Sequence, residues 1–88
     1  MSKSRAAIRT ISILELVANH AKGLTISEIA TELEIPITSV NDIVKALVDM
    51  EMLDLLDARS KAYGIGAKAF FIGNAYINNT SLIDKAKP

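Results

Sequence analysis

Apolar residues recur at helical spacing in the first quarter of the chain. From Ser4 to about Ala21 they fall three or four positions apart, at Ile8, Ile11, Leu14, Val17, Ala18 and Ala21. This spacing predicts an amphipathic helix whose apolar stripe faces the core. Ile13 and Leu16 widen the stripe, which predicts a second buried contact with another chain as a candidate partner. Gly23 follows, and glycine can end a helix in the left-handed conformation.

Two further helices joined by a tight turn are expected next. Thr25 and Glu28 have the spacing of a capping box, which starts a short helix through Leu33. Pro36 cannot lie inside that helix but is tolerated in the first turn of a new one, so the chain turns just before it. The second helix covers residues 36–51. Its inward stripe is Val40, Ile43, Val44, Leu47 and Val48, and its outer face is Thr38, Ser39, Asn41, Asp42 and Lys45.

The only strand candidates flank a polar loop. Leu53–Asp57 and Ala62–Ile65 lie on either side of residues 58–61, whose length and polarity suit a hairpin. From Ala67 to about residue 78 the pattern is helical again, with Phe70, Phe71, Ala75 and Tyr76 near one face. The polar residues 78–81 indicate a linker, and the pattern of residues 81–88 indicates the start of another helix.

Length and composition exclude several classes of protein. The 88 residues support one domain, and half of them are apolar, too many for a disordered chain. There is no unbroken apolar run of the roughly 20 residues that a membrane span needs. Without cysteine there is no disulfide or zinc–thiolate site, and the single histidine, His20, is expected near a helix C-terminus rather than on a metal. No nucleotide-binding or nucleophile motif is present, so we expect no enzyme and no cofactor. The lack of cysteine and of a secretory signal favours a cytoplasmic location.

Charge is balanced overall but unevenly distributed. Ten basic and ten acidic residues give a formal net charge of zero, whereas a nucleic-acid-binding domain usually has a basic excess. Residues 1–9 and 58–68 are basic, and residues 28–57 contain eight acids and one base, Lys45. The basic segments are either ordinary solvated faces or a two-part phosphate footprint.

The order of the predicted elements is that of a winged helix-turn-helix domain, a mainly α fold. It comprises a helix, a helix-turn-helix, a two-stranded wing and a C-terminal linker helix. A DNA major groove, about 12 Å wide, accepts one helix, and residues at the N-terminal end of that helix reach base edges. The small or hydrogen-bonding side chains of Thr38, Ser39 and Asn41 suit that position.

Several segments resemble the N-terminal DNA-binding domain of IclR-type bacterial transcriptional regulators. They are residues 11–16, 23–30, 35–40 and 63–66, within a resemblance that runs from Arg5 to Tyr76. The resemblance implies a homodimer that reads a palindromic operator in double-stranded DNA, and a small-molecule effector that binds a separate C-terminal domain. It divides the chain into a DNA-binding domain with linker helix at residues 1–79 and, at residues 80–88, a linker into an effector domain absent from this chain.

The sequence departs from the family pattern in the helix-turn-helix. Ile37 stands where the family usually has a basic residue, and Asn41 and Asp42 stand where it usually has an aromatic residue or histidine followed by arginine. Glu34 and Glu51 occupy positions that are often glycine, and a left-handed glutamate would cost about 1–2 kcal/mol relative to glycine.

Each candidate DNA-binding residue has a simpler alternative. Thr38 and Ser39 either contact bases or cap the helix, Asn41 either reads adenine or is idle, and Asp42 is either solvated or accepts from a cytosine amino group. Arg59 and Lys61 are expected on phosphates, and Arg5 and Arg9 would join them unless the first helix points them elsewhere. The full predicted set is Arg5, Arg9, Thr25, Thr38, Ser39, Asn41, Asp42, Lys45, Arg59 and Lys61.

The sequence therefore predicts a sequence-specific DNA-binding domain, with helix 36–51 in the major groove and loop 58–61 on phosphates. The alternative is a winged-helix module that binds another protein and not DNA, which the neutral net charge and the acidic middle of the chain favour.

Overall fold

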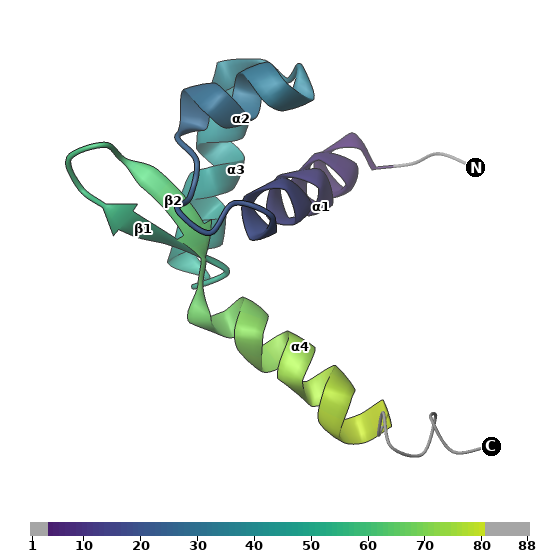
Figure 1. The fold of residues 1–88 in the computed structure, drawn as a ribbon. Coiled ribbons are helices and arrows are strands. Elements are labelled where there is room, and N and C mark those ends of the chain that lie inside the picture. Colours follow the sequence, from purple (N-terminus) through teal and green to yellow (C-terminus); the bar gives the residue numbers. More distant parts are fainter. Residues whose placement is uncertain (1–3, 81–88) are drawn as a thin grey trace.

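The computed structural model describes residues 4–80, which fold into four helices and one antiparallel hairpin (Figure 1). The order is that predicted for a winged helix-turn-helix domain. The elements are α1 (Arg5–Ala18), α2 (Ile26–Leu33), α3 (Ile37–Asp49), β1 (Leu53–Asp57), β2 (Ala62–Ile65) and α4 (Ala67–Thr80). No helix in this described part is long and apolar enough to cross a membrane.

Helix α1 ends three residues earlier than the pattern predicted. The Ser4 hydroxyl caps its start by accepting from the Ala7 backbone N–H at 3.1 Å. At the other end, the Asn19 side chain donates to the Glu15 carbonyl, and His20 Nδ1 lies 2.9 Å from the Leu16 carbonyl oxygen. These polar side chains contact backbone carbonyl oxygens that, in a longer helix, would accept hydrogen bonds only from backbone N–H groups. Gly23 has a positive φ of 82°, but it lies in a later turn, where its N–H donates to the His20 carbonyl at 2.8 Å. Asn19 is the C-cap of α1, so the expectation that Gly23 ends this helix is wrong.

The buried face of α1 matches the predicted stripe only at Leu14 and Val17. Ile13 and Val17 are buried, and Leu14 and Leu16 pack against them, whereas Ile8 and Ile11 are about half exposed. The expectation that Ile13 contacts a second chain is therefore wrong. Because α1 carries apolar residues on more than one side, periodicity alone does not select the face that meets the rest of the domain.

The helix-turn-helix forms as the local sequence predicts. The Thr25 hydroxyl accepts from the Glu28 N–H at 3.1 Å, and the Glu28 carboxylate accepts from the Thr25 N–H at 2.9 Å. Glu34 closes α2 in the left-handed conformation, and Pro36 is the N-cap of α3, one position before its first helical residue. Helix α3 is thus shorter than predicted by one residue at its start and two at its end.

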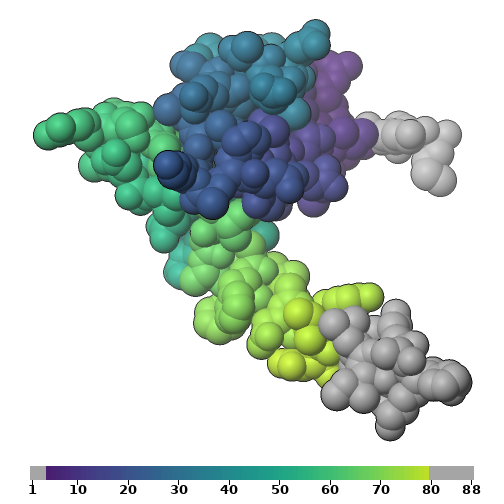
Figure 2. Space-filling model, viewed as in Figure 1, coloured from purple at the N-terminus to yellow at the C-terminus, as the bar shows by residue number. Residues whose placement is uncertain are grey.

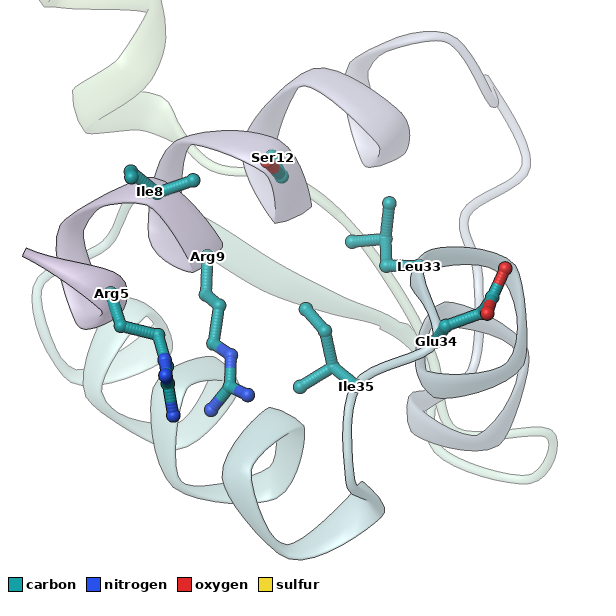
Figure 3. Close-up of a pocket in the computed structure, with 7 residues that line it drawn as sticks. All are labelled: Arg5, Ile8, Arg9, Ser12, Leu33, Glu34 and Ile35. Atoms are coloured by element: carbon teal, nitrogen blue, oxygen red, sulfur yellow. The ribbon is translucent and has the colours of Figure 1, made fainter. Parts of the chain in front are cut away.

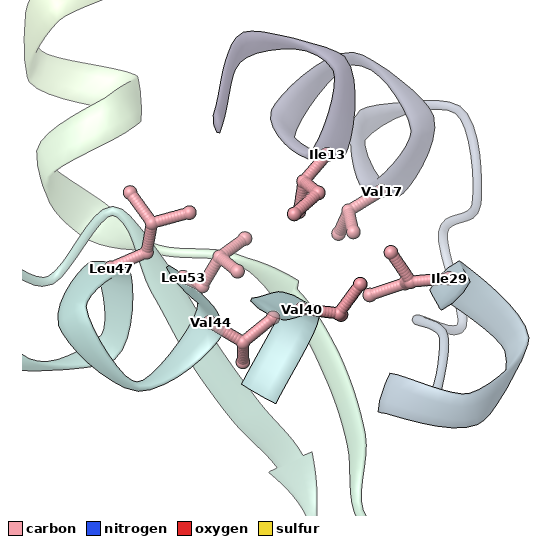
Figure 4. Close-up of a cluster of buried hydrophobic side chains, with 7 residues drawn as sticks. All are labelled: Ile13, Val17, Ile29, Val40, Val44, Leu47 and Leu53. Carbon is pink, nitrogen blue, oxygen red and sulfur yellow. The ribbon is translucent and has the colours of Figure 1, made fainter. Parts of the chain in front are cut away.

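The core draws on three helices and the first strand (Figure 4). Val40, Val44 and Leu47 on α3 are buried, as the inward stripe predicted, and Ile43 and Val48 pack beside them. They meet Ile13, Val17, Ile29 and Leu53. This contact fixes which side of α3 faces solvent.

The wing has the strands and loop that were predicted. Leu53 pairs with Ile65 and Leu55 with Tyr63, and the register shifts between Leu55 and Asp57. The wing is also tied to the segment before α2, because Leu24 and Tyr63 exchange two backbone hydrogen bonds of 2.9 and 2.7 Å. The loop of the wing is thereby held beside the start of α2.

Helix α4 leaves the body of the domain as a projecting arm (Figure 2). Its start is anchored by backbone hydrogen bonds from Gly66 to Met52 and from Lys68 to Glu51, both 2.9 Å. A Cβ at position 66 would collide with the Glu51 carbonyl, so this close approach requires glycine.

The C-terminal boundary of α4 corrects the predicted linker. The helix continues through Thr80, because adding a residue to an existing helix is easier than starting one. The expected linker at residues 78–81 is therefore wrong as far as Thr80. The helix expected over residues 81–88 lies outside the described residues.

The left-handed conformation of Glu34, with φ 55° and ψ 46°, provides a test of the turn. Glu34→Gly should raise the free energy of unfolding by about 0.5–1 kcal/mol, since relief of a strain of about 1–2 kcal/mol exceeds the extra chain entropy of glycine. Glu15→Gly, the same substitution at an exposed position within α1, should lower it by about 0.5–1 kcal/mol. Urea denaturation measures both, and equal destabilisation by the two variants would contradict the strained turn.

Candidate nucleic-acid interface

The outer face of α3 is polar and accessible. Thr38, Asp42 and Lys45 are exposed, while Ser39 and Asn41 are half-buried. They face away from the core because the opposite side of the helix holds Val40, Val44 and Leu47. The structure thus presents a row of small hydrogen-bonding side chains at the N-terminal half of α3, as predicted.

Neither Thr38 nor Ser39 caps α3. Its N-cap is Pro36, and no side chain makes a capping hydrogen bond there. The alternative role of these two residues as caps is therefore wrong. The hydroxyl of Ser39 instead lies 3.4 Å from Arg9 Nη1, which donates to it across the α1–α3 contact.

Two arginines of α1 flank this face. Figure 3 shows Arg5 and Arg9 side by side, extending from α1 toward α3. They border an open hollow of about 450 Å³ whose other walls are apolar or polar residues of α1 and the α2–α3 turn, namely Ile8, Ser12, Leu33, Glu34 and Ile35. They also border a second hollow, of about 340 Å³, with Ser39 and Asp42. The use of α1 in packing therefore leaves both guanidinium groups next to α3.

The start of α2 meets the start of α3 on the other side. A hollow of about 440 Å³ lies between them, lined by Ile26, Ser27, Ile37, Thr38, Asn41 and Asp42. Ile37 is the first residue of α3, and its side chain is 51% exposed. The two helices therefore enclose a surface depression that combines apolar, hydroxyl, amide and carboxylate groups.

Asp57 organises the loop of the wing. Its carboxylate accepts from the Arg59 backbone N–H and the Ser60 hydroxyl, both at 3.0 Å. Its carbonyl accepts from the Lys61 N–H at 2.7 Å, and Lys61 has a positive φ of 61°. The local hydrogen bonds use backbone and serine donors, so the side chains of Arg59 and Lys61 stay exposed.

The wing loop lies against the start of α2. Arg59, Ser60 and Lys61 share a hollow of about 390 Å³ with Thr25, Ile26, Ser27 and Tyr63. Thr25 is half-buried, and its hydroxyl is already engaged in the capping box. The Leu24–Tyr63 bridge accounts for this arrangement, since it fixes the second strand to the residue just before the cap.

The hollows join into one band across the domain. The wing hollow shares Ile26 and Ser27 with the α2–α3 hollow, which in turn shares Asp42 with the hollow of the two arginines. The band therefore runs from the wing over α3 to the start of α1. Nine of the ten predicted residues line it, and Lys45 lies one turn beyond Asn41 on the exposed side of α3.

Sequence reasoning missed several residues of the band. Ser27 and Ile26 connect the wing to α3, and Tyr63 lines the wing hollow. Asp57 fixes the loop through local hydrogen bonds. The spacing of Asp57 to the next two polar residues is a recognisable turn signal, whereas the adjacency of Ser27 to α3 depends on the tertiary packing.

Known proteins share both the sequence pattern and the fold. The family model of the IclR helix-turn-helix domain matches residues 6–57. The HTH-type transcriptional regulator BhcR of Paracoccus denitrificans is 31% identical over 84 residues, which cover 96% of this chain and 29% of that protein. The chain therefore spans less than a third of the length of this curated relative.

Solved structures agree on the fold. Pseudomonas aeruginosa HmgR superposes with a TM-score of 0.78 at 23% identity, over 94% of this chain and 35% of that one. An IclR family transcriptional regulator from Brucella abortus gives a TM-score of 0.76 at 24% identity, over 89% of this chain and 29% of that one. Because the family model covers more than half of the 88 residues, the chain belongs to the IclR helix-turn-helix domain family.

Proposed function

We propose that this chain binds double-stranded operator DNA as the DNA-reading domain of a bacterial transcriptional regulator. Helix α3 enters the major groove, and the wing loop and the start of α1 contact phosphates on either side. The observation that carries the proposal is the continuous band, which places hydrogen-bonding side chains of α3 between two pairs of cations. Bacterial operators lie in the cytoplasm, so the same proposal places the chain there.

The central part of the band suits base edges. Thr38 and Asn41 lie in the first turns of α3, where a helix in the major groove reaches the bases. An asparagine amide can bond adenine at two positions, and a hydroxyl can donate or accept. The uncapped N–H groups at this end of α3 also favour a nearby phosphate. These features support a reading role for α3.

The ends of the band suit the DNA backbone. Arg59 and Lys61 project from a loop whose conformation Asp57 holds, and Arg5 and Arg9 project from α1. When a basic side chain neutralises a phosphate, counterions are released from the DNA, and this release increases the affinity most at low salt. Four such residues, with Lys45 as a fifth, are the proposed phosphate contacts, and Thr25 lies beside the wing pair.

The neutral net charge is compatible with this arrangement because, among the described residues, Asp42 is the one acid that lines the three hollows of the band. Asp49 is the last residue of α3 and Glu51 follows two positions later, at the end of the helix opposite the reading end. Asp42 is the exposed acid among the α3 residues of the band. The family match favours DNA binding over a protein-binding winged-helix module.

Substitution of Asp42 tests whether α3 enters the major groove. The probe is a DNA duplex of mixed sequence that has not been selected for binding. Asp42→Arg should tighten binding and steepen the slope of log affinity against log salt by about 1, since it replaces a repelled charge with a phosphate contact. Fluorescence anisotropy at several salt concentrations measures both quantities. The side chain is exposed, so stability should change by less than about 0.5 kcal/mol.

The matched control is Asp49→Arg, the same charge change at the far end of α3. It should move the slope much less than Asp42→Arg does. If the two variants behave alike, or if neither changes affinity, then α3 does not enter the groove.

We propose further that the chain is a homodimer through the exposed apolar residues of α1 and α4. Phe70 and Phe71 are 65% and 66% exposed and lie edge to face, with ring centroids 5.8 Å apart. Ile77 on α4 and Ile8 and Ile11 on α1 are about half exposed as well. Such residues on a projecting helix are usual at an interface between chains. Leu16, which the sequence pattern offered as a contact with another chain, packs against the core and is not part of this interface.

Sedimentation velocity at high micromolar concentration tests the dimer. The molar mass obtained for the unaltered chain should be twice that of the monomer. The Phe71→Glu variant should give the monomer mass, and its circular dichroism spectrum should match that of the unaltered chain. Met50→Glu changes a residue that is 58% exposed at the end of α3, and it should leave the dimer intact. A monomer at every concentration would exclude this interface.

This chain spans 29% of the length of BhcR, a full-length transcriptional regulator. We propose that a small-molecule effector acts through another part of such a protein. The three hollows of the band are open and form the proposed DNA surface, which supports an effector site elsewhere.

A further inference from the structure

An exposed isoleucine stands at the base-reading end of α3. Ile37 is the first residue of the helix and is 51% exposed, and it does not belong to the group of residues packed against the core. With the half-buried Ile26 it forms the apolar wall of the 440 Å³ hollow. The core does not explain its presence, so its role lies at the surface.

The backbone holds Ile37 in place. Pro36 precedes it with φ −54°, and the Pro36 carbonyl accepts the first helical hydrogen bond from Val40 at 3.1 Å. Ile35, on the other side of the proline, packs against the core and donates to the Ala30 carbonyl at 3.1 Å. The apolar wall is thus preformed and needs little reordering to meet a ligand.

The chemistry of the hollow disfavours guanine. Guanine presents two acceptors in the major groove, which arginine or lysine usually satisfies. The hollow has no basic side chain, and the Asp42 carboxylate would face those acceptors. The amino group of a paired cytosine could donate to Asp42, but a G·C pair presents no methyl group to Ile37 and leaves the guanine acceptors without a basic partner in the hollow.

An A·T pair matches the same hollow. Thymine presents its C5 methyl group, which an isoleucine side chain can cover, and adenine presents an amino group and N7. The Asn41 amide can pair with adenine at both atoms, because its oxygen can accept from the amino group and its nitrogen can donate to N7. We infer that Ile37 selects thymine through its methyl group and that the operator carries A·T pairs where α3 begins. This inference rests on the proposed function.

Replacement of thymine by uracil removes only the methyl group and so isolates this contact. The probe is a duplex selected by the unaltered chain from a random library, remade with uracil at each thymine in turn. When uracil replaces the contacted thymine, the affinity of the unaltered chain should fall about fourfold, because the burial of one methyl-sized group is lost. Ile37→Ala should discriminate between the thymine and uracil duplexes much less than the unaltered chain does, since most of the apolar surface that faces the methyl group is gone.

Two variants separate this effect from general damage. Ile37→Val keeps a branched apolar side chain and should retain most of the discrimination, and Met50→Ala, at the far end of α3, should retain all of it. Melting curves confirm that each variant is folded.

The outcomes distinguish the inference from the proposed function. Failure of the unaltered chain to bind any duplex would overturn both. Binding and selection of a sequence, with uracil neutral at every position or with Ile37→Ala discriminating as strongly as the unaltered chain, would overturn the thymine contact and leave DNA binding intact.

Discussion

The inner face of α3 is the constraint on which the rest of the domain depends. Val40, Val44 and Leu47 are buried among residues of α1, α2 and β1, and loss of this contact would expose the centre of a small core. Because a helix has two sides, burial of this one turns Thr38 and Asp42 outward. The same packing places α1 across the start of α3, with Arg9 within reach of Ser39. Burial of the inner face of α3 therefore both stabilises the domain and orients the proposed DNA-reading surface.

Local sequence signals located the elements well, since each depends on neighbouring residues. The capping box at Thr25, the proline before α3 and the polar loop between the strands all lie where the pattern placed them. The face of α1 was predicted only in part because apolar residues lie on several sides of that helix, and packing against the rest of the domain selects Ile13 over Ile8. The end of α4 was predicted too early, because polar residues typical of loops can also extend an existing helix.

The sequence predicted which residue types form the candidate site, but not that the wing loop, α2 and α3 join into one surface. The outer face of α3 and the basic wing loop follow from spacing and charge. Their connection through Ser27 depends on the two hydrogen bonds between Leu24 and Tyr63, residues that are 39 positions apart and carry no signal of pairing. The hydrogen bonds that hold Arg59 and Lys61 in an exposed loop come from Asp57, an acid that charge counting alone would set against DNA binding.

The central claim is that the band from the wing over α3 to α1 is the surface that meets DNA. Backbone amide shifts of the isotope-labelled chain, recorded by nuclear magnetic resonance during titration with a short duplex at low salt, test it residue by residue. The account predicts the largest changes at residues 37–42, at Ser27 and at residues 59–61, with small changes at residues 70–79 of α4. Changes concentrated in α4 with none on α3, or no change on any residue, would contradict it.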